Sequence, residues 1–213
     1  MPITPSEAIA LQATGDGNLR LVSKMAREVD LKAAKDCIGR NALHYAAPQG
    51  HLAICKFLVE EVGIDVNSRS LEGQTPMQLT AAEGDRNVPV LRYLLDCGGD
   101  PAAPGCNGTT PLHRAAEFGH CEAVRLLLSK GVPVDPVDHR GTPLLLAATR
   151  DQDQAIKILL EHGANGSIKE ILEQENKIFL YYIPAHLIKL YRDVIWARSN
   201  STPGIPEGPK SSL

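Results

Sequence analysis

The histidines are the first residues whose types and spacing could do chemistry. His113 and His120 lie seven residues apart, Cys121 follows directly, and His44 and His51 repeat the spacing. Imidazole and thiolate groups are typical zinc ligands, but a zinc site needs three or four of them converging on the metal. Cys121 is the only nearby thiol, so a metal site would lack its further ligands. We therefore favour a structural role, in which buried histidines hydrogen-bond to their neighbours.

A second group of residues could bind calcium or transfer protons. Asp135, Asp138 and His139 occur together in the segment Asp-Pro-Val-Asp-His-Arg. Carboxylates coordinate calcium, and carboxylates and imidazoles act as acids and bases. Asp and Pro are also favoured in turns, where they satisfy the backbone geometry. We favour the second interpretation, a loop between two structural units.

Recognised catalytic and cofactor motifs are absent from the sequence. It contains no GxxxxGKS/T phosphate loop, no GxGxxG dinucleotide loop, no HExxH zinc motif and no GxSxG nucleophile elbow. We therefore predict a protein that is not an enzyme, with no metal, no cofactor and no small-molecule substrate.

Composition and charge describe an ordinary globular chain. Of 213 residues, 43% are hydrophobic and 22% are charged, and 22 Lys and Arg against 25 Asp and Glu give a net charge of −3. Nucleic-acid binding usually requires a basic excess, so we expect no nucleic-acid partner. The aromatic content of 4% is low for a β-sandwich and fits small helices rich in Ala and Leu.

The expected compartment is the cytoplasm or the nucleus. The first residues show neither the basic region nor the apolar core of a secretory signal, and no apolar run of 18 residues predicts a membrane span. An odd number of cysteines without a CxxC pair is typical of reduced thiols. The five are Cys37, Cys55, Cys97, Cys106 and Cys121.

An internal repeat must position all of these residues. Four segments begin at Asn41, Thr75, Thr110 and Thr142, separated by 34, 35 and 32 residues. Each segment continues with a pair of small residues, a Gly or Asp at a turn, and an apolar pair such as Leu127-Leu128. A repeat of this period predicts stacked supersecondary units.

The residues of each repeat favour two short helices joined by a turn. Thr before Pro supplies an N-cap hydroxyl followed by a residue whose missing N–H is not needed. Small residues let the two helices approach, and a turn Gly can adopt positive φ. The apolar pair, Leu127-Leu128 in the fourth unit, is predicted to contact the neighbouring unit, because a single unit cannot bury a core of its own.

The signature Thr110-Pro111-Leu112-His113-Arg114-Ala115 resembles that of the ankyrin repeat family, and the resemblance covers roughly residues 8–165. Residues 96–165 are also similar to the ankyrin half of plant ankyrin–tetratricopeptide proteins, although no tetratricopeptide pattern follows Gly166. The resemblance implies an all-α solenoid of about five helix–turn–helix units with hairpin-like loops, and binding of a partner protein. It further implies that His44 and His113 tie the loops of adjacent units together.

These observations predict seven segments. Residues 5–36 form an N-terminal capping unit, and further units occupy residues 37–70, 71–105, 106–137 and 138–166. A helical extension is expected over 167–198 and a disordered tail over 199–213, which is rich in Ser, Pro and Gly. Two extra residues within 85–89 predict a bulged turn, and Asp151 replaces the turn Gly of the fifth unit.

The resemblance also implies which residues face a partner protein or peptide. The variable positions of the family are the loop tips and the exposed end of each first helix, on a concave face. Besides Ile38, they correspond here to Arg40, Gln49, Glu72, Gln74, Glu83, Asn107, Thr109, Phe118, His139, Arg140 and Arg150.

Two features of this set suggest binding, and each has a plainer alternative. Phe118 stands where the family usually has a polar residue, so it is a hot-spot candidate unless it packs on neighbouring helices. The charges change sign along the stack, from Glu72 and Glu83 to Arg140 and Arg150. A charged partner could use that pattern for register, or it is a solvated surface.

The predicted extension offers a competing function. Leu187, Leu190, Tyr191, Val194 and Ile195 fall on one face of a helix. This apolar stripe could cap the last unit, pair with another chain, or attach the protein to a membrane, since basic residues alternate with apolar ones there. The alternative function is therefore a membrane-peripheral adaptor.

Overall fold

The computed structural model describes residues 3–164, which form five pairs of short helices. The described residues contain ten α-helices. In addition, a π-helical turn, η1, directly follows α4, and a 3-10 turn, η2, directly precedes α6. The bounds are α1 (Pro5–Gly15), α2 (Leu19–Met25), α3 (Ala42–Ala46), α4 (Leu52–Lys56), η1 (Phe57–Glu61), α5 (Pro76–Ala82), η2 (Asp85–Asn87), α6 (Val88–Asp96), α7 (Pro111–Glu117), α8 (Cys121–Ser129), α9 (Pro143–Thr149) and α10 (Asp153–Glu161).

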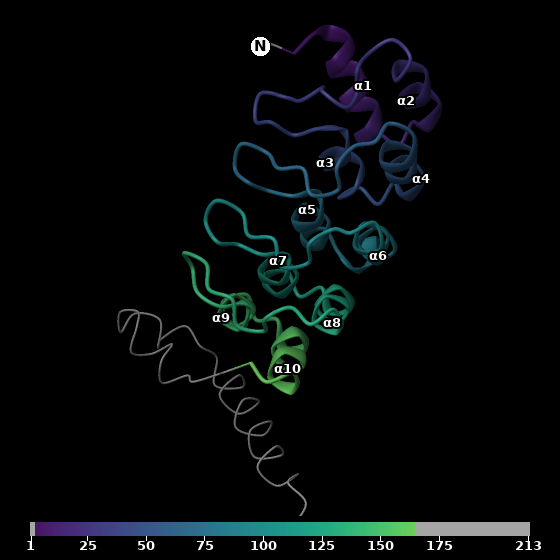
Figure 1. The fold of residues 1–213 in the computed structure, drawn as a ribbon. Helices are drawn as coiled ribbons and strands as arrows, with labels where there is room; N and C mark the ends of the chain where they lie inside the picture. The colour runs from purple at the N-terminus through teal and green to yellow at the C-terminus, as the bar shows by residue number, and fades with distance from the viewer. Residues whose placement is uncertain (1–2, 165–213) are drawn as a thin grey trace, which may run out of the picture.

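The helix pairs stack in two layers (Figure 1). The first helices α1, α3, α5, α7 and α9 pack on one another in chain order, and the second helices α2, α4, α6, α8 and α10 do the same. Long loops project to one side of the first helices. Residues 3–164 contain no extended strand, and one isolated bridge joins Asp138 and Gly141. The predicted all-α solenoid is confirmed.

The first helices begin where the sequence places their caps. Thr75 caps α5 and Thr142 caps α9, and each hydroxyl accepts a hydrogen bond from a backbone N–H three residues later at 3.3 Å. In both helices Pro is the first helical residue. Asn41 caps α3 instead, with its side-chain oxygen 3.1 Å from the N–H of Leu43. These caps satisfy N–H groups that a helix start leaves without partners.

The two irregular turns match their predictions. The extra residues of the third unit form η2, which precedes α6 and is absent from the other described pairs. Asp151 has φ of 54° and is the one non-glycine residue with positive φ within residues 3–164. Asp tolerates this conformation better than most residues, so the fifth turn is preserved without glycine.

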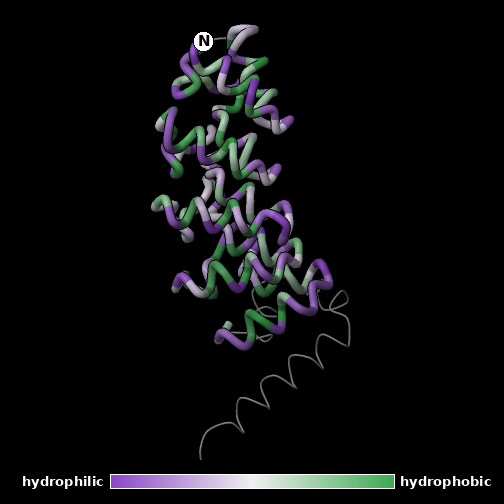
Figure 2. Tube along the Cα trace, turned by 90° about the vertical axis from the view of Figure 1, so that its right-hand side faces the viewer, coloured by the Kyte–Doolittle hydropathy of each residue, from purple (hydrophilic) through white to green (hydrophobic). Residues whose placement is uncertain are grey.

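The hydrophobic core lies between the two helix layers and between successive units. Leu58, Leu94, Leu127 and Leu159 occupy corresponding positions near the ends of the second helices, and each has no exposed surface. Figure 2 shows hydrophobic segments recurring along the whole stack, with hydrophilic segments recurring at its edges. Stability is thus distributed over every junction between units, as expected of a solenoid.

The loop tips are linked to one another by backbone hydrogen bonds. Leu71 N–H donates to Ile38 C=O at 2.8 Å, Cys106 N–H to Glu72 C=O at 3.1 Å, and His139 N–H to Asn107 C=O at 3.2 Å. A Cβ added at Gly73 would lie 2.8 Å from the nitrogen of Cys106, so glycine permits this close approach.

The predicted extension (167–198) and tail (199–213) lie outside the described residues, as does the capping stripe. Within residues 3–164, the helices are too short to include one that is both long and apolar enough to cross a bilayer.

Candidate partner-binding face

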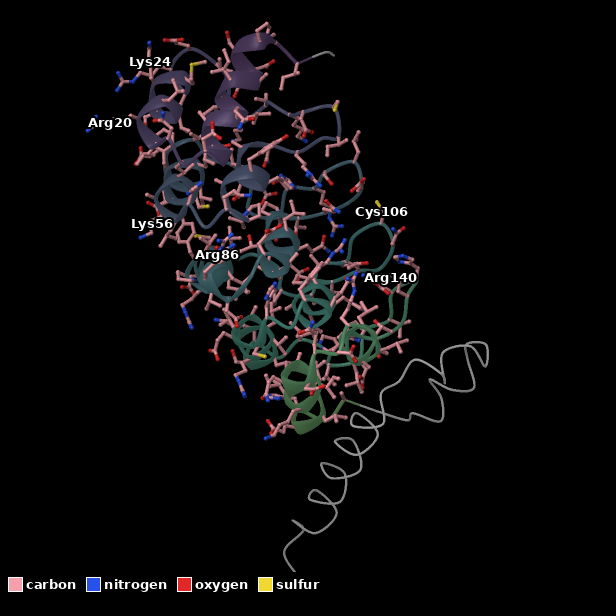
Figure 3. All side chains as sticks on the ribbon, turned by 180° about the vertical axis from the view of Figure 1, so that it is seen from behind. Arg20, Lys24, Lys56, Arg86, Cys106 and Arg140 are labelled. Carbon is pink, nitrogen blue, oxygen red and sulfur yellow. The ribbon has the colours of Figure 1, made fainter. Side chains whose placement is uncertain are left out.

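One surface of the stack is made by the first helices and the loops, and we call it the inner face. Arg20, Lys24, Lys56 and Arg86 lie on the opposite, second-helix side, whereas Cys106 and Arg140 belong to the loops (Figure 3). The two layers therefore present different side chains.

Hydrogen bonds from the first helices hold the loops of this face in place. His44 Nε2 lies 3.0 Å from the carbonyl oxygen of Gln74, and His113 Nε2 lies 3.1 Å from that of Gly141. Gln78 takes the corresponding place in the third unit, donating to the carbonyls of Ala103 and Thr109 at 2.7 and 2.6 Å. Each side chain thus holds the loop of the next unit.

The two histidines are held in the neutral form. The Nδ1 atom of His113 accepts the N–H of Thr110 at 3.1 Å, so Nε2 carries the hydrogen that is donated to Gly141. Burial lowers the pKa of His44 to about 4, and burial also lowers the pKa of His113. Their role is to join units, and the described residues contain no group of three His, Cys, Asp or Glu that could hold a metal.

A buried glutamate organises the inner face between the fourth and fifth units. Glu117, at the end of α7, is 4% exposed. Its carboxylate receives Nη1 of Arg140 at 2.9 Å and Nη2 of Arg150 at 3.2 Å, and Arg114 lies 3.6 Å away. A buried carboxylate requires such partners, because the unpaired charge would be strongly unfavourable. Three guanidinium groups therefore gather around one carboxylate.

A second carboxylate supports the same cluster from the loop of the fifth unit. Asp138 receives the hydroxyl hydrogen of Thr109 at 2.7 Å and Nη2 of Arg140 at 3.3 Å. Burial alone would raise the pKa of Asp138, but the hydrogen bonds from the Thr109 hydroxyl and from the Arg140 backbone N–H, together with the charge of Arg140, hold it below its usual value. Thr109, which the resemblance places among the partner-binding positions, is 8% exposed, because the neighbouring loop brings Asp138 over its hydroxyl.

Phe118 follows Glu117 directly and remains partly in solvent. It is 41% exposed, and the guanidinium carbon of Arg150 lies 5.9 Å from its ring centroid. The ring also stacks on His120, with centroids 6.1 Å apart and 21° between the planes. The ring therefore contacts two neighbouring side chains and remains 41% exposed, and its role as a hot spot stays a prediction.

A cavity of about 550 Å³ opens on the inner face over the first three units. Tyr45, Pro48 and Leu79 supply apolar surface to it. Asp16 and Glu83 are exposed carboxylates at the same cavity, and neither forms an ion pair with a Lys or Arg within residues 3–164. This end of the face combines an apolar lining with unneutralised negative charge.

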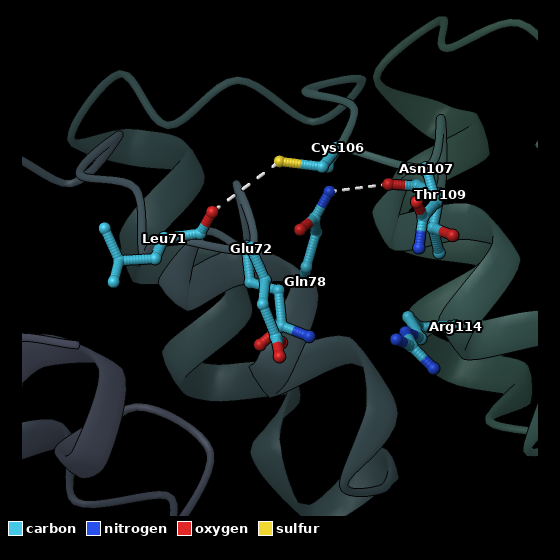
Figure 4. Close-up of a pocket in the computed structure, with 9 residues that line it drawn as sticks. Leu71, Glu72, Gln78, Cys106, Asn107, Thr109 and Arg114 are labelled. Carbon is cyan, nitrogen blue, oxygen red and sulfur yellow. Dashed lines mark hydrogen bonds between the residues drawn. The ribbon is translucent and has the colours of Figure 1, made fainter. Parts of the chain in front are cut away.

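A second cavity, of about 370 Å³, lies between the loops of the third and fourth units. Figure 4 shows Glu72 and Arg114 on opposite sides of it, with Gln78 between the loops. Its lining is mainly polar and includes Cys106 and Asn107. A hydrogen bond of 2.9 Å from Arg40 Nη2 to Gln74 Oε1 joins the linings of the two cavities.

Thr109 is buried, and the other predicted binding residues divide into two groups. Arg40, Gln74 and Arg140 are half-buried and engaged in bonds within the chain. The exposed residues are Gln49, Glu72, Glu83, Asn107, Phe118, His139 and Arg150. Arg140, Arg150 and Phe118 come together around Glu117, while Gln49 and Glu83 share the first cavity.

Sequence reasoning missed Glu117 and Arg114. At these two repeat positions the other units carry Pro48, Ala82 and Thr149, or Tyr45, Leu79 and Leu146. A charged pair three residues apart on one helix, where sibling repeats are mostly apolar, was the available signal.

Comparison with known proteins agrees with this architecture. The family model "Ankyrin repeats (3 copies)" matches residues 6–70 and 64–138, and the model "Ankyrin repeat" matches residues 139–170. The chain belongs to the ankyrin repeat family. Ankyrin repeats generally mediate protein–protein interaction, and this chain is a protein-binding scaffold of that kind.

Three relatives show how far the similarity extends. The chain is 42% identical over 83 residues to human ankyrin repeat domain-containing protein 53, which covers 38% of this chain and 16% of the relative. It is 31% identical over 188 residues to the E3 ubiquitin-protein ligase XBAT32 of Arabidopsis thaliana, a match that covers 68% of this chain and 36% of the relative. It is 31% identical over 147 residues to the tyrosine-protein kinase HTK16 of Hydra vulgaris, a match that covers 61% of this chain and 19% of the relative.

The relatives are thus much longer proteins, of which this chain spans between 16% and 36%. The similarity to an Arabidopsis protein is consistent with the plant-like character expected from the sequence. The ligase and kinase names describe those whole proteins.

Proposed function

We propose that this chain binds a partner protein or peptide on its inner face and acts without catalysis. The observation that carries the proposal is Phe118, an aromatic ring that is 41% exposed and flanked by the guanidinium of Arg150. Aromatic and arginine side chains are enriched among the residues that dominate binding energy. Two cavities on the same face extend this surface across the first four units.

The buried clusters beneath this surface support the proposal. Arg140 forms ion pairs with both Glu117 and Asp138, and Glu117 also pairs with Arg150, so the position of Arg150 beside Phe118 is favoured before a partner arrives. Preorganisation reduces the ordering entropy lost on binding. The exposed candidates Gln49, Glu83 and Asn107 are then the residues that contact a partner beside Phe118.

The test is a comparison of proteins captured by the full chain and by two matched variants. Phe118→Ala removes the exposed ring of the inner face, and Leu19→Ala removes a comparably exposed apolar side chain, 36%, from the second-helix layer. A direct partner is expected to be captured by the Leu19→Ala variant and not by the Phe118→Ala variant. The same difference should appear first in capture from a cell extract and then in binding between the purified proteins. Equal retention of every captured protein by the two variants would refute the inner face as the binding surface.

A further inference from the structure

The charges of the inner face are not balanced locally. At the N-terminal end, Asp16, Glu72 and Glu83 are exposed and form no ion pair with a Lys or Arg of the described chain. Two cations lie at this end: Arg40 is half-buried and directs its guanidinium to Gln74, and the exposed Lys35 is near enough to His44 to help lower the pKa of His44. Asp16 accepts a hydrogen bond from Gln12 Nε2 at 2.8 Å, and no hydrogen bond or ion pair of the Glu83 side chain is found within the described residues. A carboxylate without an ion-pair partner beside the apolar surface of the first cavity favours a ligand group that is basic and carries an aliphatic stem.

The C-terminal end has the opposite imbalance. Arg114, Arg140 and Arg150 surround the carboxylates of Glu117 and Asp138, which leaves one positive charge in excess. Arg140 is bonded to both carboxylates, whereas Arg150 contacts Glu117 through Nη2 and is largely exposed. The remaining N–H groups of Arg150 can therefore donate to an incoming anion, in the geometry that suits a carboxylate.

The two ends are connected along one surface. The first cavity includes Arg40, which bonds to Gln74 in the lining of the second cavity. The second cavity includes Arg114, which lies 3.6 Å from Glu117 in the arginine cluster. A single extended segment can thus follow the inner face from Glu83 to Arg150.

We propose that the inner face binds an extended segment of the partner that carries a basic side chain at one end and an acidic side chain at the other. The basic group lies against Glu83 in the first cavity, and the acidic group lies against Arg150 and Arg114. An apolar residue beside the acidic group packs on the exposed side of Phe118. This assignment rests on the proposed function and adds the chemistry of the partner.

The stack sets the spacing between the two charges. Glu83 follows α5 and Arg150 follows α9, so they occupy the same place in units separated by one intervening unit. Packed helices lie about 8–10 Å apart, so the two side chains are separated by roughly 16–20 Å along the stack. An extended segment advances about 3.3 Å per residue, and the charges of the ligand are therefore about five or six residues apart.

The test uses the full chain and a random peptide display library, followed by binding of the selected peptides in solution. Selected peptides are expected to share one basic and one acidic residue at this spacing. Glu83→Lys should weaken binding about tenfold, because like charges then face each other, and changing the basic residue of the peptide to Glu should restore it. Arg150→Gln should also weaken binding, and changing the basic residue of the peptide to Glu should not restore the binding of this variant.

The controls separate this inference from the proposed function. Glu122→Lys and Arg125→Gln alter exposed charges on α8, in the second-helix layer, and should leave binding unchanged. Thermal melts of each variant establish that it is folded. Peptides that are lost with Phe118→Ala but show no charge pattern, or that ignore Glu83→Lys, would overturn the bipolar ligand and leave the proposed function standing. Failure to select any peptide that Phe118→Ala weakens would remove support for both.

Discussion

The junction between the third and fourth units and the junction between the fourth and fifth use different chemistry for the same task. At the first junction, Gln78 holds the loop carbonyl of Thr109, and His120 reaches back to the carbonyl of Ala82 at 3.0 Å. At the second, Gln152 stands in the place of His120 but donates to Arg150 within its own turn. The ion pairs of Glu117 bridge this junction instead.

The difference shows that a repeat fixes the architecture while leaving the polar contacts free to vary. The hydrogen bonds of Gln78 involve no ionised side chain and add no charge to the surface. The ionic junction needs arginines, and it therefore places spare guanidinium donors on the inner face. The polar contacts that join the fourth and fifth units thus also supply the arginine that our proposal assigns to an acidic ligand group.

Burial of apolar side chains should stabilise both junctions equally, and its removal should give the largest loss of unfolding free energy. Leu127→Ala and Leu94→Ala each remove a fully buried side chain at corresponding positions, so each should cost about 2–5 kcal/mol of unfolding free energy. Urea unfolding of the two variants measures the loss. A midpoint for Leu127→Ala equal to that of the wild type would refute the repeat register.

The contribution of ion pairs to stability should differ between the two junctions. Glu117→Gln leaves the three arginines without their shared carboxylate and should destabilise the chain by about 3 kcal/mol at low salt. The difference from wild type should shrink as salt is added, because the arginines are partly exposed and are screened. Glu122→Gln, an exposed glutamate on α8, is the matched control. A salt-independent loss would show that charge is not what stabilises this junction.

The hydrogen bonds that buried histidines form between units should make stability depend on pH, through His44 between the second and third units and through His113 between the fourth and fifth. The pKa of His44 is about 4 in the folded chain and about 6.5 when unfolded, so the unfolded state binds more protons between these values. Stability is present in full above pH 6.5 and is lost as the pH falls towards 4, by about 2 kcal/mol at pH 5.

His44→Gln tests this account with a residue that the chain already uses at the corresponding position, Gln78. The variant should keep the loop hydrogen bond and lose part of the pH dependence between pH 6.5 and 4. Chemical unfolding at several pH values gives the comparison, and identical pH profiles for variant and wild type would contradict a neutral, buried His44.

The smallest effect is expected at the helix caps, which both junctions share. Thr110→Ala and Thr142→Ala should each cost about 1 kcal/mol, because a cap stabilises only the start of one helix. The Thr110 hydroxyl also lies 2.9 Å from Nδ1 of His113. Unfolding of the two variants under one condition should therefore rank Thr110→Ala as the equal or larger loss, and the reverse order would show that the contact with His113 adds nothing.

Most of the fold could be predicted because its determinants are local and repeated. The Thr-Pro starts, the extra residues before α6 and the Asp at position 151 each specify backbone geometry within a few residues. The contacts of the inner face could not be predicted in this way. Thr109 is buried by Asp138, 29 residues later, and Glu117 is paired with Arg140 and Arg150, 23 and 33 residues later.

The third unit shows the same limit on a smaller scale. The turn position occupied by His51 and His120 in neighbouring units holds Asp85 in this unit, and the hydrogen bond back to the preceding unit comes from Asn87, whose amide donates to Pro48 at 2.6 Å. The two extra residues shift this position along the chain. Alignment by sequence alone cannot reveal which side chain compensates for an insertion.

The backbone bonds between loop tips have a consequence for how such a chain can change. Each tip from Leu71 to His139 is anchored to the tip before it through main-chain atoms. Every residue can supply the carbonyl acceptor, and every residue except proline can supply the N–H donor. Side chains at the tips can therefore be exchanged, in evolution or in the laboratory, while the hydrogen-bonded backbone of the loops keeps its shape. Lengthening a single tip would disturb its neighbours on both sides, so new specificity in this molecule is most readily gained by substitution and least readily by insertion.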